Sequence, residues 1–340
     1  MKTILITILV FGVIIMIHEL GHFVAAKLFG VKVNEFSLGM GPALLKFTKG
    51  ETDYRLRLLP IGGFVSMEGE NEESAEDRAF CNKPAWQRLI VLAAGAFMNL
   101  VLGFILVGTL VGQMQLIGTT TVANFYPEAV SSRWLQPYDT IVGVNGQRVS
   151  GYNDAIFQMV RDQDGVIDFE VMRQGEKVLL EGVAFDTTEL SDGTTSMVLD
   201  FQFFGEEKNL FNSLGYTFDW TVSIAKQVWF SLGDIITGRY GLNQLSGPVG
   251  TSSAIGEAAS AGLQSLVMLV SFITINVGVF NLLPIPALDG GRILFVLIEL
   301  IIRRPVPQKY ESIIHAVGFI LLMGLIVAIT FNDIFKLIVG

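Results

Sequence analysis

The chain has 340 residues, of which 51% are hydrophobic, with a mean hydropathy of +0.53 and a formal net charge of −9. This composition excludes an ordinary soluble enzyme and predicts a multi-span protein of the lipid bilayer, while the negative charge argues against a nucleic acid partner. The single cysteine, Cys81, excludes an internal disulfide and a cysteine-rich zinc site.

Long apolar stretches predict four transmembrane helices, with a membrane-associated β-hairpin or small sheet after the first and a β-rich domain inserted after the second. The apolar stretches cover residues 4–29, 88–114, 263–302 (broken by prolines) and 312–336. We expect four regions: helices 1 and 2 with the β segment in 1–115, the inserted domain in 116–204, an interfacial helix and connector in 205–262, and helices 3 and 4 in 263–340.

The first apolar stretch contains His18-Glu19-Leu20-Gly21-His22, an H-E-x-x-H pattern. On a helix the two histidines lie one turn apart on the same face, where they can grip a zinc ion, and Glu19 is placed to reach a water on that ion. A metal-free polar cluster or a cleaved signal peptide would also fit the pattern. Both are disfavoured, because an unpaired Glu at membrane depth is costly and no clear cleavage site follows.

The segment between the first two apolar stretches predicts strands at 33–37, 43–47 and 54–59, separated by glycines and prolines. We expect a small β-hairpin or sheet that lies at the membrane surface or dips into it. The second stretch then carries Gly95 and Asn99. Gly95 would let two helices approach closely, and Asn99 would make either a helix–helix hydrogen bond or a contact to the helix with the two histidines.

Residues 116–204 predict a small β-rich domain. A short helix is expected at 152–161, and residues 135–146 resemble the core signature of a PDZ domain. The segment 208–237 is apolar but interrupted by charges, which indicates an interfacial helix, and 245–262 is a connector rich in small residues. The predicted strands of the inserted domain are 119–125, 139–144, 166–173, 176–185 and 195–203.

The third apolar stretch ends in a proline-broken segment followed by Asp289. The prolines break the helix, and a carboxylate at membrane depth favours a bound cation. A salt bridge from Asp289 to Arg292 is the alternative. The remaining histidine, His315, is the alternative third ligand of a zinc site.

Topology brings these residues to one depth, because the first and third of four spans run in the same direction. Nine lysines and arginines lie in 27–88, and more follow between the third and fourth spans. The positive-inside rule therefore places both connections in the cytosol, with both termini and the inserted domain outside. The histidines and Asp289 then lie toward the cytosolic side.

Taken in order, the H-E-L-G-H segment, Gly95 to Asn99, the inserted PDZ-like domain and Asn281 to Asp289 resemble the site-2 protease family of intramembrane zinc metalloproteases. The likeness is to the bacterial regulator of sigma-E protease type with a single PDZ domain. The resemblance implies that His18, His22 and Asp289 bind Zn²⁺ and that Glu19 is the catalytic acid and base.

The same resemblance implies cleavage of single-span transmembrane substrates inside the bacterial cell membrane, after their outer domains have been trimmed. Anti-sigma factors and signal-peptide remnants are both possible substrates, and the oligomeric state is left open. A helical substrate must unwind to expose its carbonyls, and an extended segment can add to a strand edge. The candidate contacts to this extended segment are Asn276, Asn281, Gly62, Gly63 and Asn99.

Two other functions remain open on the residues alone. A catalytically silent PDZ scaffold is disfavoured because a mere metal site has no need of Glu19. A metal transporter is disfavoured because it would need several polar residues along a path, and the sequence offers one cluster.

Overall fold

The computed structural model describes residues 2–70, 72–162, 164–189, 195–238, 245–304 and 306–339. The chain divides into two compact units. The first unit consists of Met1–Leu106 and Phe230–Gly340, and the second of Val107–Trp229.

Four helices in the described residues are long and apolar enough to cross a membrane, in agreement with the four predicted spans. With 27 residues, α1 is about 40 Å long, which exceeds a hydrocarbon core of about 30 Å. Helix α8 leaves most of its apolar side chains uncovered by protein, as contact with lipid requires. The chain is therefore a membrane-embedded protein. The four helices are α1 (Lys2–Leu28), α2 (Ala85–Gln113), α6 (Leu263–Leu282) and α8 (Gln308–Val339).

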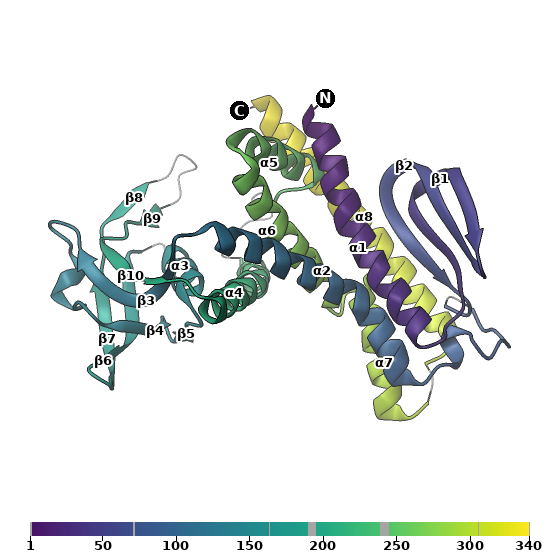
Figure 1. Ribbon diagram of the computed structural model, residues 1–340, viewed down its shortest axis with the longest axis horizontal. Helices are drawn as coiled ribbons and strands as arrows, with labels where there is room; N and C mark the ends of the chain where they lie inside the picture. Colours follow the sequence, from purple (N-terminus) through teal and green to yellow (C-terminus); the bar gives the residue numbers. More distant parts are fainter. Residues whose placement is uncertain are drawn as a thin grey trace. The chain divides into compact units, whose positions relative to one another are not determined.

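Two shorter α-helices also lie in the first unit (Figure 1): α5 (Pro248–Ala261) and α7 (Asp289–Ile302). Helix α5 lies in the segment expected to be a connector. Pro248 occupies its first turn, where a missing N–H costs nothing. The buried Asp333 of α8 accepts a hydrogen bond from the Gly250 N–H at 2.8 Å, so a distant carboxylate stabilises the start of this helix.

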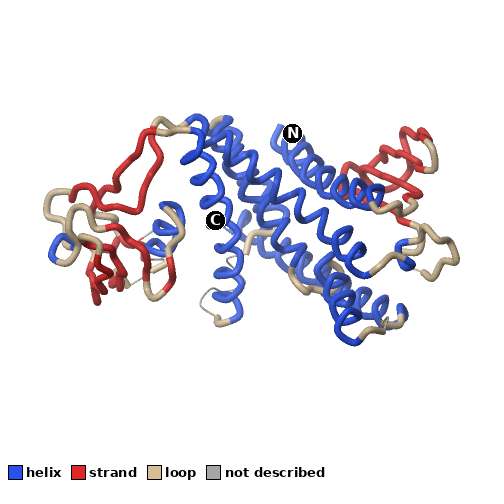
Figure 2. Tube along the Cα trace, turned by 60° about the horizontal axis from the view of Figure 1, so that its bottom comes forward, coloured by secondary structure: helices blue, strands red, loops and turns tan. Residues whose placement is uncertain are grey.

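The β segment is a hairpin of two long strands, β1 (Val33–Lys49) and β2 (Thr52–Met67), beside α1 (Figure 2). The sequence predicted three short strands in this region. The strands are longer because the glycines between them, such as Gly39 and Gly41, adopt positive φ and bend the strand without ending it.

At the hairpin turn, hydrogen bonds from Arg78 and then Lys27 lower the pKa of Glu51 to about 2.

The hairpin curls so that one strand segment has neighbours on both sides. Residues 33–38 pair with 63–67 on one side and lie beside 53–56 on the other. Residues 43–49 pair in turn with 52–57. Segment 63–67 therefore forms an edge, with a strand partner on one side only among the described residues.

The second unit contains a six-stranded antiparallel sheet in the order β10-β3-β4-β6-β7, with β5 paired to β4. Helix α3 (Tyr152–Val160) packs with the sheet, and most of α4 (Leu210–Ile236) belongs to this unit. Phe169, Phe201 and Ile141 are fully buried in its core. The six strands of this sheet are β3 (Leu116–Phe125), β4 (Thr140–Val144), β5 (Gln147–Arg148), β6 (Val166–Arg173), β7 (Glu176–Ala184) and β10 (Phe201–Glu207). A separate two-stranded sheet pairs β8 (Thr187–Glu189) with β9 (Thr195–Met197).

Helices α1 and α2 touch through backbone at Gly21. A Cβ on Gly21 would lie 2.3 Å from the carbonyl oxygen of Ala94 and 2.9 Å from Cα of Gly95. No side-chain rotation can relieve such a contact, because the opposing atoms belong to the main chain of α2. A glycine at this position therefore sets the distance between the two helices.

We expect Gly21→Ala to lower the stability of the protein by about 1–3 kcal/mol, because the added methyl must push α1 and α2 apart. Thermal unfolding of the purified full-length protein in detergent measures the effect. Gly12→Ala is the matched control on the same helix, since a Cβ there meets nothing within 4 Å. Equal melting temperatures for the two variants would contradict the contact.

Candidate metal centre

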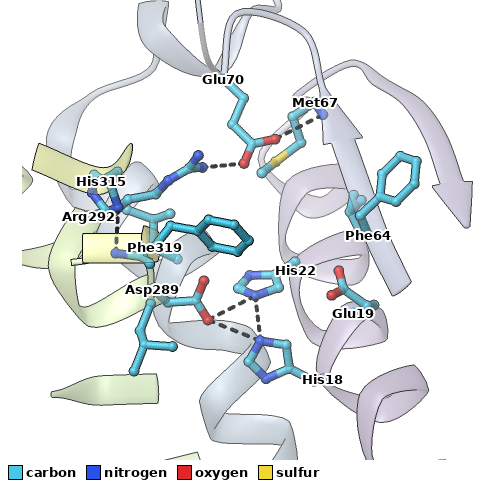
Figure 3. Close-up of a pocket in the computed structure, with 14 residues that line it drawn as sticks. His18, Glu19, His22, Phe64, Met67, Glu70, Asp289, Arg292, His315 and Phe319 are labelled. Carbon is cyan, nitrogen blue, oxygen red and sulfur yellow. Dashed lines mark hydrogen bonds and ion pairs between the residues drawn. The ribbon is translucent and has the colours of Figure 1, made fainter. Parts of the chain in front are cut away.

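Three side chains from distant parts of the chain converge in the first unit (Figure 3). Asp289 Oδ2 lies 3.0 Å from Nε2 of His18 and 3.3 Å from Nε2 of His22. The two Nε2 atoms are 3.2 Å apart. All three donor atoms lie within 4.8 Å of one another, which is the spacing of ligands around one ion.

The local fold explains this convergence. His18 and His22 share one face of α1, as their spacing predicts. Helix α6 ends at Leu282, a proline-containing loop follows, and Asp289 is the first residue of α7. A Cβ on Gly290 would lie 2.0 Å from the carbonyl oxygen of Leu283, so the loop folds tightly onto the start of α7.

The three atoms suit a cation better than they suit one another. The Val91 carbonyl can only accept, so His22 donates through Nδ1, at 2.8 Å. The Nε2 atom of a neutral His22 then carries a lone pair, and this lone pair faces the carboxylate oxygen of Asp289. Asp289 Oδ2 is itself buried and has no hydrogen-bond partner. Two imidazole nitrogens and a carboxylate oxygen are a donor set that zinc accepts.

A cavity of about 340 Å³ opens beside this cluster. Glu19 lines it and lies beside the two imidazoles. A water in this cavity could contact Glu19 and an ion held by the three side chains together. The remaining lining residues are Phe64, Val65, Met67, Glu70, Leu92, Ala287, Leu288, Arg292, His315 and Phe319.

The edge segment of the hairpin forms one wall of the cavity. Val65 and Met67 line it, and a Cβ on Gly63 would lie 3.2 Å from Cγ of Glu19. The strand backbone thus approaches α1 closely at Gly63. An extended peptide paired with this edge would lie along the cavity.

Arg292 forms an ion pair with Glu70, and the structure gives Asp289 the two histidines as its neighbours. These contacts favour the two histidines over Arg292 as the neighbours of Asp289. Glu70 also accepts a hydrogen bond from the Met67 N–H at 3.3 Å. This carboxylate connects the end of the edge strand to α7, the helix that carries Asp289.

The other predicted site residues lie outside the cavity lining. Gly62 precedes Gly63 in β2 with a positive φ of 79°. Asn99 contacts His18, and Asn276 and Asn281 lie on α6. Their predicted contacts to substrate stay predictions.

Sequence reasoning missed the roles of two residues around the metal cluster. Gly95 was expected to allow close helix packing, and it does more: a Cβ there would lie 2.3 Å from Nε2 of His22 and 2.8 Å from Cε1 of His18. Its missing side chain makes room for both rings. His315 accepts a hydrogen bond at Nδ1 from the Ala287 N–H, at 3.0 Å, so it supports the loop that leads to Asp289. No local sequence pattern reveals either contact.

The chain is similar over nearly its whole length to known proteins. The profile of peptidase family M50 matches residues 6–325. A protein of Clostridium perfringens with the provisional name zinc metalloprotease is 37% identical over 335 residues, which cover 97% of this chain and 98% of that protein. The regulator of sigma-W protease RasP of Bacillus subtilis is 27% identical over 425 residues, covering 99% of each chain. The zinc metalloprotease RasP of Geobacillus kaustophilus is 28% identical over 423 residues, covering 99% of this chain and 98% of that protein.

We expect Gly95→Ala to lower zinc affinity by about 10-fold or more, because the methyl group must displace the imidazoles of His18 and His22 from their positions. Metal analysis of the purified protein after dialysis against a chelator measures the loss. Gly112→Ala on the same helix is the control, since its Cβ meets nothing within 4 Å. Full zinc retention in Gly95→Ala would show that the rings do not need this space.

Proposed function

The chain belongs to peptidase family M50, the site-2 proteases, and is a zinc metalloprotease, and from this premise we propose that His18, His22 and Asp289 hold the zinc ion. The observation that carries the proposal is the convergence of two Nε2 atoms and one carboxylate oxygen within 4.8 Å. Three protein ligands leave a fourth position open, as catalytic zinc sites require.

Asp289 is a better third ligand than His315. His315 accepts a hydrogen bond from the Ala287 N–H at Nδ1, so the lone pair of Nδ1 is already used. A neutral imidazole has its hydrogen on the other nitrogen, which leaves no lone pair for a metal. Asp289 Oδ2, in contrast, is buried and faces Nε2 of His18 at 3.0 Å and Nε2 of His22 at 3.3 Å.

Glu19 is the proposed acid and base of the reaction. When bound, zinc polarises the scissile carbonyl and lowers the pKa of a coordinated water to about 7. Glu19 lines the same cavity and is not one of the three proposed ligands, so its carboxylate is available to take the proton of the attacking water and then to give it to the leaving amine. The half-buried position of Glu19 supports this role, because the cavity holds the carboxylate beside the reacting atoms.

The substrate is proposed to be a single-span membrane protein that binds in extended form. In a helix each carbonyl is tied up in an i→i−4 hydrogen bond, so the scissile segment must unwind before it can be attacked. Edge segment 63–67 supplies backbone groups for strand addition next to Glu19. Gly62, Gly63, Asn276 and Asn281 remain candidate contacts to this extended segment, and the apolar residues exposed on the hairpin, such as Leu44 and Phe47, suit contact with lipid.

The relative from Bacillus subtilis is named a regulator of sigma-W protease. We infer by analogy that this chain takes part in regulated intramembrane proteolysis, and that it cuts anti-sigma factors or signal-peptide remnants after another protease has trimmed them outside. The segment 116–204 is proposed as a PDZ domain. Its antiparallel sheet and short helix support this assignment.

The orientation is inferred from charge: the PDZ domain and both termini outside, and the zinc site toward the cytosolic side of a bacterial cell membrane. A catalytically silent scaffold is less well supported, since Glu19 lies in the cavity without coordinating anything. A metal transporter is less well supported because the described residues contain one metal-binding cluster and not a series of them.

We expect Glu19→Gln to reduce cleavage of a model transmembrane substrate by about 100-fold or more and to leave zinc bound, because glutamine keeps the shape of the side chain and cannot accept the proton. Cleavage in detergent and metal analysis of the same sample give both quantities. Glu72→Gln, an exposed carboxamide substitution, is the control. Zinc-independent cleavage, or zinc lost together with activity, would argue against the role given to Glu19.

We expect Asp289→Ala to lower zinc occupancy, because only two protein ligands remain, while His315→Ala should keep the ion. Metal analysis after equilibration with a chelator of known affinity separates the two variants. The opposite pattern would make His315 the third ligand and would remove Asp289 from the site.

A further inference from the structure

Asn99 is a polar residue in the apolar helix α2 whose place in the site the proposed function does not explain. Its side chain is fully buried, so it has no access to the cavity beside the metal cluster. The side-chain nitrogen Nδ2 lies 3.3 Å from Nδ1 of His18. The side-chain oxygen Oδ1 is buried and has no hydrogen-bond partner.

The chemistry of His18 decides which atom of the amide should face it. His18 directs Nε2 toward Asp289 and His22, so a neutral ring that binds an ion there must carry its hydrogen on Nδ1. The atom next to Nδ1 must then be an acceptor. The oxygen and nitrogen of an asparagine amide have nearly the same shape, and their assignment follows from the hydrogen bonds they make. Turning this amide over brings the orphaned Oδ1 to His18 as the acceptor and moves the NH₂ group to the place that Oδ1 held.

The second histidine is held in the same way. His22 donates its Nδ1 hydrogen to the carbonyl oxygen of Val91 at 2.8 Å. Val91, Gly95 and Asn99 are spaced four residues apart, so they form one stripe along α2 that faces α1. Val91 provides an acceptor for the ring of His22, and Gly95 leaves space for both rings. Asn99 can provide an acceptor for the ring of His18.

We propose that Asn99 is a positioning residue for the zinc ligand His18, whose Nδ1–H donates to Asn99 Oδ1. The bond fixes the tautomer that presents Nε2 to the ion and stops the ring from rotating. This inference rests on the proposed assignment of His18 as a ligand, and it replaces the expected contact between Asn99 and substrate.

The amide NH₂ group of the turned Asn99 has candidate acceptors on α6. This helix passes the same part of α2, because a Cβ on Gly103 would lie 3.4 Å from a side-chain carbon of Thr274, and one on Gly278 would lie 3.0 Å from the carbonyl oxygen of Ala96. Two side-chain oxygens of α6 are buried without a partner: Thr274 Oγ1 and Asn276 Oδ1.

The test compares zinc affinities of purified full-length variants in detergent, measured by competition with a chelator. Asn99→Leu keeps the approximate shape and removes the acceptor, so we expect zinc affinity to fall by about 10- to 100-fold. Asn99→Asp keeps the acceptor and should bind zinc at least as tightly as the unsubstituted protein. Cobalt substitution adds a second measurement, because the visible absorption of bound cobalt reports the ligand geometry.

Two controls separate the possible failures. Ser271→Ala removes another buried polar group from the helical part of the first unit and should leave zinc affinity unchanged. His18→Ala should abolish tight binding, and retained affinity there would refute the proposed zinc site itself. With His18→Ala behaving as expected, unchanged affinity in Asn99→Leu, or an equal loss in Asn99→Leu and Asn99→Asp, would overturn the role of Asn99. If Asn99→Leu fails to fold, Asn99→Ala takes its place in the same comparison.

Discussion

Two imidazole nitrogens and a carboxylate oxygen face one another at 3.0–3.3 Å in an apolar helical bundle, and this close approach of three potential metal ligands is the constraint on which the proposed site depends. The surrounding fold makes this approach possible. Glycine at position 21 lets α2 approach α1, and glycine at 95 leaves room for the rings. The break between α6 and α7 delivers Asp289 to the depth of the histidines. A continuous helix could not offer that carboxylate from its first turn.

The metal cluster and the strand edge are also connected mechanically. Glu70 lies three residues after the end of the edge segment and pairs with Arg292, which lies one turn beyond Asp289 on α7. The wall that would receive an extended peptide and the helix that carries an anionic ligand are thus held at a fixed distance by one ion pair. If a substrate pairs with the edge as proposed, this link would hold its scissile carbonyl in register with an ion bound to Asp289.

The sequence was sufficient to predict the features that depend only on the spacing of residues along the chain. Helical spacing brings His18 and His22 together, and the lengths of the apolar stretches predict four spans. Contacts that depend on packing between distant segments were not predictable. The partner of Arg292 is 222 positions away in the chain, and the backbone bond to His315 depends on how α8 packs against the proline loop. The hairpin itself was predicted correctly, but its strand lengths were not, because the glycines were taken as strand ends. Helix α5 was missed because its small residues suggested a connector, whereas the buried Asp333 bonds to its first turn.

The open edge of segment 63–67 has a consequence for the choice of substrate. Unpaired backbone groups at membrane depth cost several kcal/mol each, so an edge placed there would gain from any strand that covers it. If a transmembrane substrate unwinds at this edge as proposed, its helix exchanges its own hydrogen bonds for bonds to the edge, and the net cost is smallest where the helix is weakest. Glycine lowers helix stability by about 1 kcal/mol relative to alanine, and proline by about 3 kcal/mol. Discrimination among membrane proteins would then follow how easily a short stretch of each span melts, and side-chain identity at the cut bond would matter less.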